Sequence, residues 1–232
     1  MKKALLPILG VTLVLSACDM APSNTSLETL TEKASYSIGQ NIAKNFKSPD
    51  APEISNDALV QGIRDALNDE SELTEEEQAT ALQEFQTQLQ KDRTEKQTQI
   101  AGVNKVAGQQ YLNENKTKDG VIELESGLQY KVIKAGQGRS PKLTENVTVH
   151  YRGTLINGTE FDSSYKRNQP VSFPVNGVIK GWTEALQRMK PGDKWMLYIP
   201  SELAYGDAGA GALIEPGSTL IFETELISID TK

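Results

Sequence analysis

A long stretch without proline, residues 74–112, constrains the fold more than any other part of the chain. Thr74 can cap a first helical turn while Glu77 reaches back to the cap backbone, the arrangement known as a capping box. A helix of this length usually extends beyond the core of the domain in which it begins. Residues 90–99 carry no apolar stripe, and a helix that is polar all round is typical of a solvated bridge. We therefore predict two domains joined by one helix.

Apolar residues at helical spacing occupy both ends of this predicted helix. The first group is Leu82, Phe85 and Leu89, and the second is Ile100, Val103, Val106 and Tyr111. We expect the first half to pack with the helices that precede it and the second half to lead to the next domain.

Two shorter helices are predicted before residue 74. Apolar residues recur every four positions at Ala34, Ile38, Ile42 and Phe46, and a second helix begins at the cap candidate Ser55. Helices confined to residues 34–89 offer a thin core, and small domains often make up such a deficit by oligomerising. We therefore expect a homodimer through these N-terminal helices, with a monomer carrying an extended helix as the alternative. The expected segments are a helical dimerisation domain at 31–89, a linker helix and hinge at 90–119, and a second domain at 120–232.

The first residues have the pattern of an export signal. Two lysines precede an apolar run, 4–15, that is too short to span a bilayer, and a small-residue cleavage site ending at Cys18 follows. This site resembles a bacterial lipobox, which implies a signal peptide at 1–17, acylation of Cys18, a tether at 18–30 and a periplasm-facing lipoprotein. An ordinary cleaved signal with a spare thiol is the alternative. Asp19 resembles an inner-membrane retention signal, but that rule varies between organisms, so inner and outer membrane both stay open.

Charge and rare residues exclude several classes of function. The formal net charge of −7 argues against a nucleic-acid partner. With one His and one Cys, the chain cannot hold a Cys/His zinc site, an intrachain disulfide or a persuasive Cys–His nucleophile pair. We expect no metal and no cofactor.

The segment after residue 120 changes to strands and turns. In residues 147–152 the period is two, which places Val147, Val149 and Tyr151 on one face and His150 on the other. Residues 128–133, 195–200 and 220–226 also read as strands, and a short helix lies within 178–189. We predict an antiparallel sheet wrapped on one helix, an α+β architecture, with His150 pointing away from the site.

Aromatic and branched residues recur here beside very few groups capable of covalent chemistry. The blocks are His150-Tyr151-Arg152-Gly153, Phe161-Asp162-Ser163-Ser164, Val178-Ile179-Lys180-Gly181-Trp182, Ala204-Tyr205-Gly206 and Thr219-Leu220-Ile221-Phe222. Such a composition is usual for an apolar ligand or peptide cleft with a few placed polar atoms. Each large apolar residue taken alone is more often core than site, and Asp-Ser-Ser taken alone indicates a turn.

In this order the blocks resemble the signature of the FK506-binding (FKBP) family of peptidyl-prolyl isomerases, and the whole chain resembles its bacterial macrophage infectivity potentiator (Mip-like) lipoprotein subgroup. The resemblance implies catalytic roles for Asp162, Tyr205, Tyr151 and Phe161, with Asp162 ionised and held by Tyr151 and Arg167. It implies a proline pocket with Trp182 as its floor and Val178, Ile179 and Phe222 as walls, a flap at Leu213 and Ile214, and a rim at Val171. The chain departs from the best-known eukaryotic members at Val171, Gly177 and Ala210, which puts substrate preference in doubt rather than catalysis.

The resemblance implies an isomerase that acts on unfolded or proline-containing protein clients outside the cytoplasm. Catalysis would need no nucleophile, because a dry pocket can bind the twisted form of the X-Pro amide. The alternative is a dimeric chaperone whose clefts mainly hold unfolded chains. A surface adhesin is a third interpretation, which no residue supports.

Overall fold

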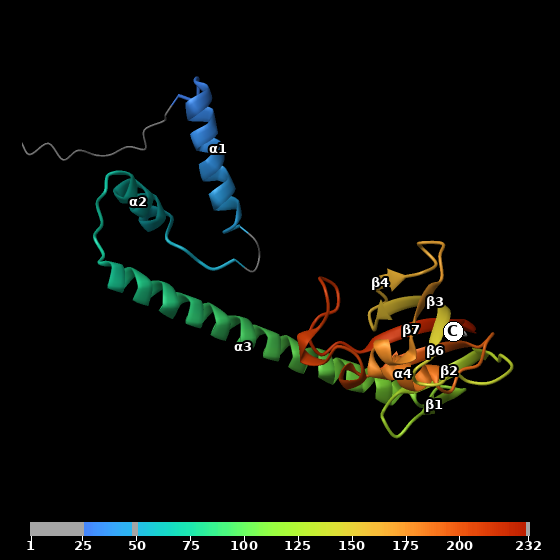
Figure 1. Cartoon of the computed structure of the whole chain (residues 1–232). Helices are drawn as coiled ribbons and strands as arrows, with labels where there is room; N and C mark the ends of the chain where they lie inside the picture. Colours follow the sequence, from blue (N-terminus) through green and yellow to red (C-terminus); the bar gives the residue numbers. More distant parts are fainter. Residues whose placement is uncertain (1–25, 48–50, 231–232) are drawn as a thin grey trace, which may run out of the picture. The chain divides into compact units, whose positions relative to one another are not determined.

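The computed structural model describes residues 26–47 and 51–230, which form two compact units that divide between Thr74 and Glu75 (Figure 1). The predicted acylation of Cys18 and the signal at Asp19 lie outside the described residues, as does most of the predicted tether. Within the described ranges, no helix has an apolar run long enough to cross a bilayer.

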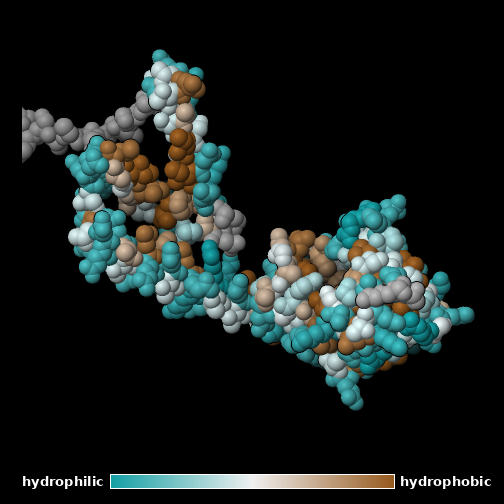
Figure 2. All heavy atoms as spheres, in the orientation of Figure 1, coloured by the Kyte–Doolittle hydropathy of each residue, from teal (hydrophilic) through white to brown (hydrophobic). Residues whose placement is uncertain are grey.

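The first unit contains α1 (Leu30–Lys44) and α2 (Asn56–Leu67). Thr29 and Glu32 form a capping box at the start of α1, and Ser55 caps α2 by accepting the backbone N–H of Ala58 at 3.3 Å, as its sequence predicted. Neither helix holds a buried residue. Their apolar side chains are exposed, Ile38 by 61% and Ile63 by 44%, and Figure 2 shows apolar residues gathered on the helices of this unit.

The predicted long helix is α3 (Glu75–Asn115), which has 41 residues and begins directly after Thr74. Its packed face differs from the apolar stripe that the sequence suggested: Val103 and Val106 are 65% and 72% exposed. The buried positions are Ala101, Gly108, Leu112 and Asn115. The whole helix groups with the C-terminal unit, whereas we expected its first half to belong to the helical domain. The domain limits stay a prediction, because α3 runs without a break through the expected boundary.

The C-terminal unit is built on a seven-stranded antiparallel sheet with strand order β1-β2-β6-β7-β3-β4, and β5 pairs with β3. The strands are β1 (Val121–Glu123), β2 (Gln129–Lys134), β3 (Asn146–Leu155), β4 (Glu160–Ser163), β5 (Val171–Pro174), β6 (Lys194–Ile199) and β7 (Leu220–Asp230). A short helix, α4 (Lys180–Leu186), and three 3₁₀ turns, η1 (Val175–Gly177), η2 (Ser201–Leu203) and η3 (Gly206–Ala208), complete the unit. The predicted α+β class, with a helical N-terminal region and an antiparallel sheet beside a short helix, is confirmed.

The core lies between the inner face of the sheet and α4. Alternation along β3 buries Val147 and Val149, and the same period buries alternate residues of β6 and β7, as the sequence predicted. Helix α4 approaches β6 closely because Gly181 has no side chain: a Cβ there would lie 2.5 Å from Ile199 Cγ2. The turn that Asp-Ser-Ser would indicate taken alone begins only at Ser164, because Asp162 and Ser163 belong to strand β4.

Candidate active site

A cavity of about 810 Å³ opens on the inner side of the sheet beside α4. Its lining residues are mostly aromatic or aliphatic, and they come from strands β3, β4, β5 and β7, from the segment around η1 and α4, and from the loop after β6. They are Tyr151, Phe161, Asp162, Val171, Phe173, Gly177, Val178, Ile179, Trp182, Tyr205, Ala210, Gly211, Ala212, Leu213, Ile214 and Phe222. The structure thus brings the predicted site residues together around one cavity, with the exception of Arg167.

Trp182 lies in the first turn of α4, where its backbone N–H donates to the Ile179 carbonyl at 3.0 Å. The indole is only 4% exposed and meets two neighbours nearly edge to face. Its centroid lies 5.4 Å from that of Tyr151, at 88°, and 5.1 Å from that of Phe222, at 81°. This geometry is favoured between aromatic rings and fixes their orientation, so Trp182 offers a rigid apolar surface to a ligand.

Gly153, on the inner face of β3, allows two other rings to meet. A Cβ at this position would lie 2.6 Å from Phe161 Cε2 and 2.8 Å from Phe222 Cε1. Because glycine lacks this Cβ, the ring centroids of Phe161 and Phe222 lie 5.5 Å apart with their planes at 83°. The glycine of the Tyr-Arg-Gly block therefore shapes the wall of the cavity.

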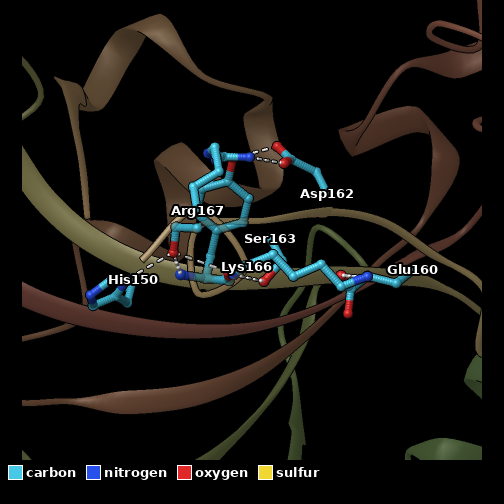
Figure 3. Close-up of polar contacts among 8 residues, drawn as sticks. His150, Glu160, Asp162, Ser163, Lys166 and Arg167 are labelled. Carbon is cyan, nitrogen blue, oxygen red and sulfur yellow. Dashed lines mark hydrogen bonds and ion pairs between the residues drawn. The ribbon is translucent and has the colours of Figure 1, made fainter. Parts of the chain in front are cut away.

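Asp162 is the charged residue at the cavity, and it is tied to two partners. The Tyr151 hydroxyl and the Arg167 guanidinium both donate to its carboxylate, and Arg167 Nη2 also donates to the Tyr151 hydroxyl at 3.0 Å. Figure 3 shows Arg167 directed at the Asp162 carboxylate. Burial alone would raise the pKa of Asp162, but these hydrogen bonds and the charge of Arg167 outweigh it and hold the pKa below its usual value. The carboxylate is therefore ionised at neutral pH and already paired.

The loop between β6 and β7 closes one side of the cavity. Tyr205 is 41% exposed, Leu213 is 49% exposed and Ile214 is buried. Ala210 and Ile214 exchange two backbone hydrogen bonds, of 2.8 and 3.2 Å, which fold residues 210–214 into a compact tip. We call residues 205–219 the flap.

The structure places two further residues relative to the cavity. Arg167, expected to hold the Asp162 carboxylate, donates to it but does not itself line the cavity. Phe173 was missed, although it lines the cavity and its ring lies 5.5 Å from that of Trp182. The signal for it was available, because Val171 was singled out and a strand period of two places Phe173 on the same face.

The sole histidine lies away from the cavity, as predicted. His150 Nδ1 is 2.9 Å from Ser164 Oγ, and its ring stacks on Tyr165 at 4.7 Å. Among the residues that the structure describes, no cluster of His, Cys, Asp or Glu could hold a metal ion. What the cavity offers is an apolar, ring-walled surface with one paired carboxylate and one exposed tyrosine hydroxyl.

Comparison with known proteins agrees with this geometry. A family model described as FKBP-type peptidyl-prolyl cis-trans isomerase matches residues 137–227, and one described as the domain amino terminal to FKBP-type peptidyl-prolyl isomerase matches residues 31–132. The chain is 47% identical over 233 residues to the peptidyl-prolyl cis-trans isomerase Mip of Coxiella burnetii, with 100% of both chains covered. It is 44% identical to a protein of Legionella longbeachae named outer membrane protein MIP, with 99% of this chain and 97% of the relative covered. The crystal structure of FkpA from Escherichia coli superposes with a TM-score of 0.71 at 38% identity, covering 88% of this chain and 98% of that one. The chain therefore belongs to the FKBP-type peptidyl-prolyl cis-trans isomerase family and is an isomerase of prolyl peptide bonds.

Proposed function

We propose that the cavity accelerates isomerisation by taking the X-Pro amide out of water and binding its twisted form. The barrier to rotation, ~18–20 kcal/mol, arises from amide resonance, which places negative charge on the carbonyl oxygen. In the twisted transition state that resonance is lost and the oxygen becomes less negative. Water stabilises the planar amide more than the twisted one, so a dry cavity lowers the barrier. The observation that carries this proposal is the ring-walled cavity over Trp182 with a single paired carboxylate at its edge.

Each polar group at the cavity has a proposed part in this mechanism. The ionised Asp162 lies beside the bound amide and disfavours the negative carbonyl oxygen of the planar form more than that of the twisted form. Tyr205 donates its hydroxyl to a substrate carbonyl, and the backbone N–H of Ile179 holds a neighbouring one. Tyr151 and Arg167 keep Asp162 ionised and oriented, which is supported by their hydrogen bonds to its carboxylate.

The apolar residues of the cavity bind the substrate in this proposal. Trp182 forms the floor under the proline ring, and Phe161 is one of the walls. The other walls and the rim are Tyr151, Val171, Phe173, Val178, Ile179, Leu213, Ile214 and Phe222.

NMR exchange between the cis and trans forms of a short apolar-X-Pro peptide tests the mechanism. Asp162→Ala should remove most of the acceleration that the unmodified chain gives. Glu160→Ala is the matched control, because Glu160 lies on the same strand but pairs with Lys166 at 2.8 Å and does not line the cavity. Equal loss of activity in both variants would contradict the proposed role of Asp162, and so would full activity in both.

We further propose that α1 and α2 form a homodimer with a second copy of the chain. The proposal is supported by apolar side chains on both helices that no residue of the described chain buries, such as Ile38 and Ile63. Ile38→Glu should yield a monomer in sedimentation analysis, whereas Lys33→Glu, on the polar side of α1, should leave the dimer intact. A dimeric Ile38→Glu variant would argue against this interface.

We also propose that the chain acts on exported proteins while anchored in a bacterial membrane through acylated Cys18. The relative from Legionella longbeachae is named an outer membrane protein, which supports a membrane location without deciding between inner and outer membranes. Fractionation of cells that express the chain or its Cys18→Ser variant tests the anchor: the chain should sediment with membranes and the variant should not.

A dimeric chaperone is the second candidate function, and the exposed apolar faces of α1 and α2 favour it. In a dimer, binding of the second cleft to the same client is intramolecular, so weak clefts hold a long unfolded chain well. The two functions separate by substitution. Asp162→Ala should reduce isomerisation and leave suppression of aggregation, whereas Ile38→Glu should reduce suppression of aggregation and leave isomerisation of short peptides.

A further inference from the structure

The C-terminal half of α3 lies against the base of the flap, the loop after β6 in Figure 1. Asn104 Nδ2 donates to the Pro216 carbonyl at 2.8 Å, and Lys105 Nζ lies 2.6 Å from Asp207 Oδ1. Asn104 and Lys105 share one face of the helix with Ala101 and Gly108, at i, i+3, i+4 and i+7.

Two glycines make this approach possible. A Cβ on Gly108 would overlap Thr219 Oγ1 and lie 3.0 Å from Thr219 Cβ. A Cβ on Gly217 would overlap the Ala101 carbonyl oxygen and lie 2.8 Å from Ala101 Cα. The Cβ added to Gly217 would meet the backbone of α3, so the flap would have to move away from the helix. The Cβ added to Gly108 would meet the Thr219 side chain, which would have to be displaced.

These contacts hold both ends of the flap. Asp207 lies near its start, two residues after Tyr205, and Pro216 and Thr219 lie near its end. The ends are also joined to each other, because the Gly217 N–H donates to the Gly206 carbonyl at 2.9 Å. The tip of the flap, which lines the cavity and includes Leu213, lies in the sequence between these two contact regions.

We propose that Gly108 and Asn104 of α3 are positioning residues for prolyl isomerisation, which fix the flap at the distance from Trp182 at which it closes on a bound peptide. A flap fixed before binding loses less conformational freedom when the peptide arrives, so the contacts strengthen peptide binding without touching the peptide. The inference rests on the proposed part of Tyr205 and Leu213 in holding substrate.

Gly108→Ala in the full-length chain tests the proposed positioning role. The added methyl must displace Thr219, and overpacking of this kind strains the contact between α3 and the flap. We expect kcat/KM for the apolar-X-Pro peptide, from NMR exchange at several peptide concentrations, to fall roughly 5- to 30-fold, mainly through a higher KM. The methyl signals of Leu213 should shift, and those of Leu226, buried in the core, should not.

Two companion variants separate positioning from a general loss of structure. Gly102→Ala adds the same methyl to the same helix where nothing lies within 4 Å, and it should leave kinetics and flap signals unchanged. Thr219→Ala, combined with Gly108→Ala, removes the overlapping hydroxyl and should recover most of the activity. Unchanged KM and unshifted Leu213 signals in Gly108→Ala would overturn the proposal, and so would a loss of activity that Thr219→Ala fails to relieve.

Asn104→Ala keeps the proposal testable if Gly108→Ala does not fold, because it adds no atom and deletes the hydrogen bonds from Asn104 to the Pro216 carbonyl and, at 3.3 Å, to Glu215 Oε2. It should raise KM at least about two- to tenfold, the range expected for the loss of one net hydrogen bond. An Asn104→Ala variant with an unchanged KM would refute the positioning role. Tyr205→Phe, in the same assay, tests the flap itself. Full activity of this variant would contradict the proposed role of Tyr205, independently of the results for the α3 variants.

Discussion

Gly153→Ala changes the cavity without altering any residue that lines it. The new Cβ would lie 2.6 Å from Phe161 Cε2 and 2.8 Å from Phe222 Cε1, whereas carbon atoms in ordinary contact are ~3.5–4.0 Å apart. One or both rings must therefore move by about 1 Å, and overpacking of a core costs about 1–3 kcal/mol of unfolding free energy. Because Phe222 also packs on Trp182, the displacement reaches the floor of the cavity.

Urea unfolding and NMR exchange with the apolar-X-Pro peptide measure the two effects of Gly153→Ala separately. We expect a stability loss of about 1–3 kcal/mol and a fall in kcat/KM of tenfold or more, since misplacement by 1 Å can cost ~100-fold in rate. Gly102→Ala, which adds its methyl in open space, should change neither. A folded Gly153→Ala variant with kcat/KM within about twofold of the unmodified chain would show that the placement of these rings does not control catalysis.

Two further predictions concern carboxylates whose pKa is lowered. Asp162 has a lowered pKa, so its favourable contribution to the free energy of unfolding is present above its unfolded-state pKa. This contribution is lost as pH falls through the folded-state pKa. Tyr151→Phe removes one donor and should raise this pKa, which moves the acid limb of the kcat/KM profile to higher pH; an unmoved limb would show that Asp162 does not set it. The pKa of Glu145 is lowered from 4.5 to about 2, chiefly by hydrogen bonds from Arg139 and the Lys142 backbone. Arg139→Ala should bring it back toward 4.5 in a ¹³C NMR titration, and the pH dependence of stability between about 2 and 4.5 should shrink with it.

The sequence predicted the longer strands and the helices but missed the shortest strands, for a physical reason. Strands β3, β6 and β7 are long enough for alternating burial to appear in the sequence, and the caps of α2 and α3 lie at or next to their predicted positions. Strands β1 and β5 have only three and four residues, too few for a period to be recognised. They pair because β2 and β3 present open edges to them, which local sequence does not encode.

The packing of α3 shows a different limit of sequence reasoning. Apolar periodicity pointed to Val103 and Val106, yet both are exposed, and the helix docks through Gly108 and Asn104. Contact between two backbones requires small residues and directed hydrogen bonds, and these leave no hydrophobic signature. At the site, the motif order identified most of the cavity, but the exclusion of Arg167 from its lining depends on where the side chain ends rather than on its position in the chain.

The pairing of Asp162 with Arg167 has a consequence for how quickly clients are captured. Among the described residues that line the cavity, Asp162 is the only charged one, and it is paired with the opposite charge of Arg167. Electrostatic steering accelerates association only where an unbalanced field extends into solvent, and at physiological ionic strength such a field decays over ~8 Å. The pair should therefore add little to any salt dependence in the rate at which charged peptides enter the cleft, and discrimination among neutral peptides begins only after contact, through shape and the loss of water.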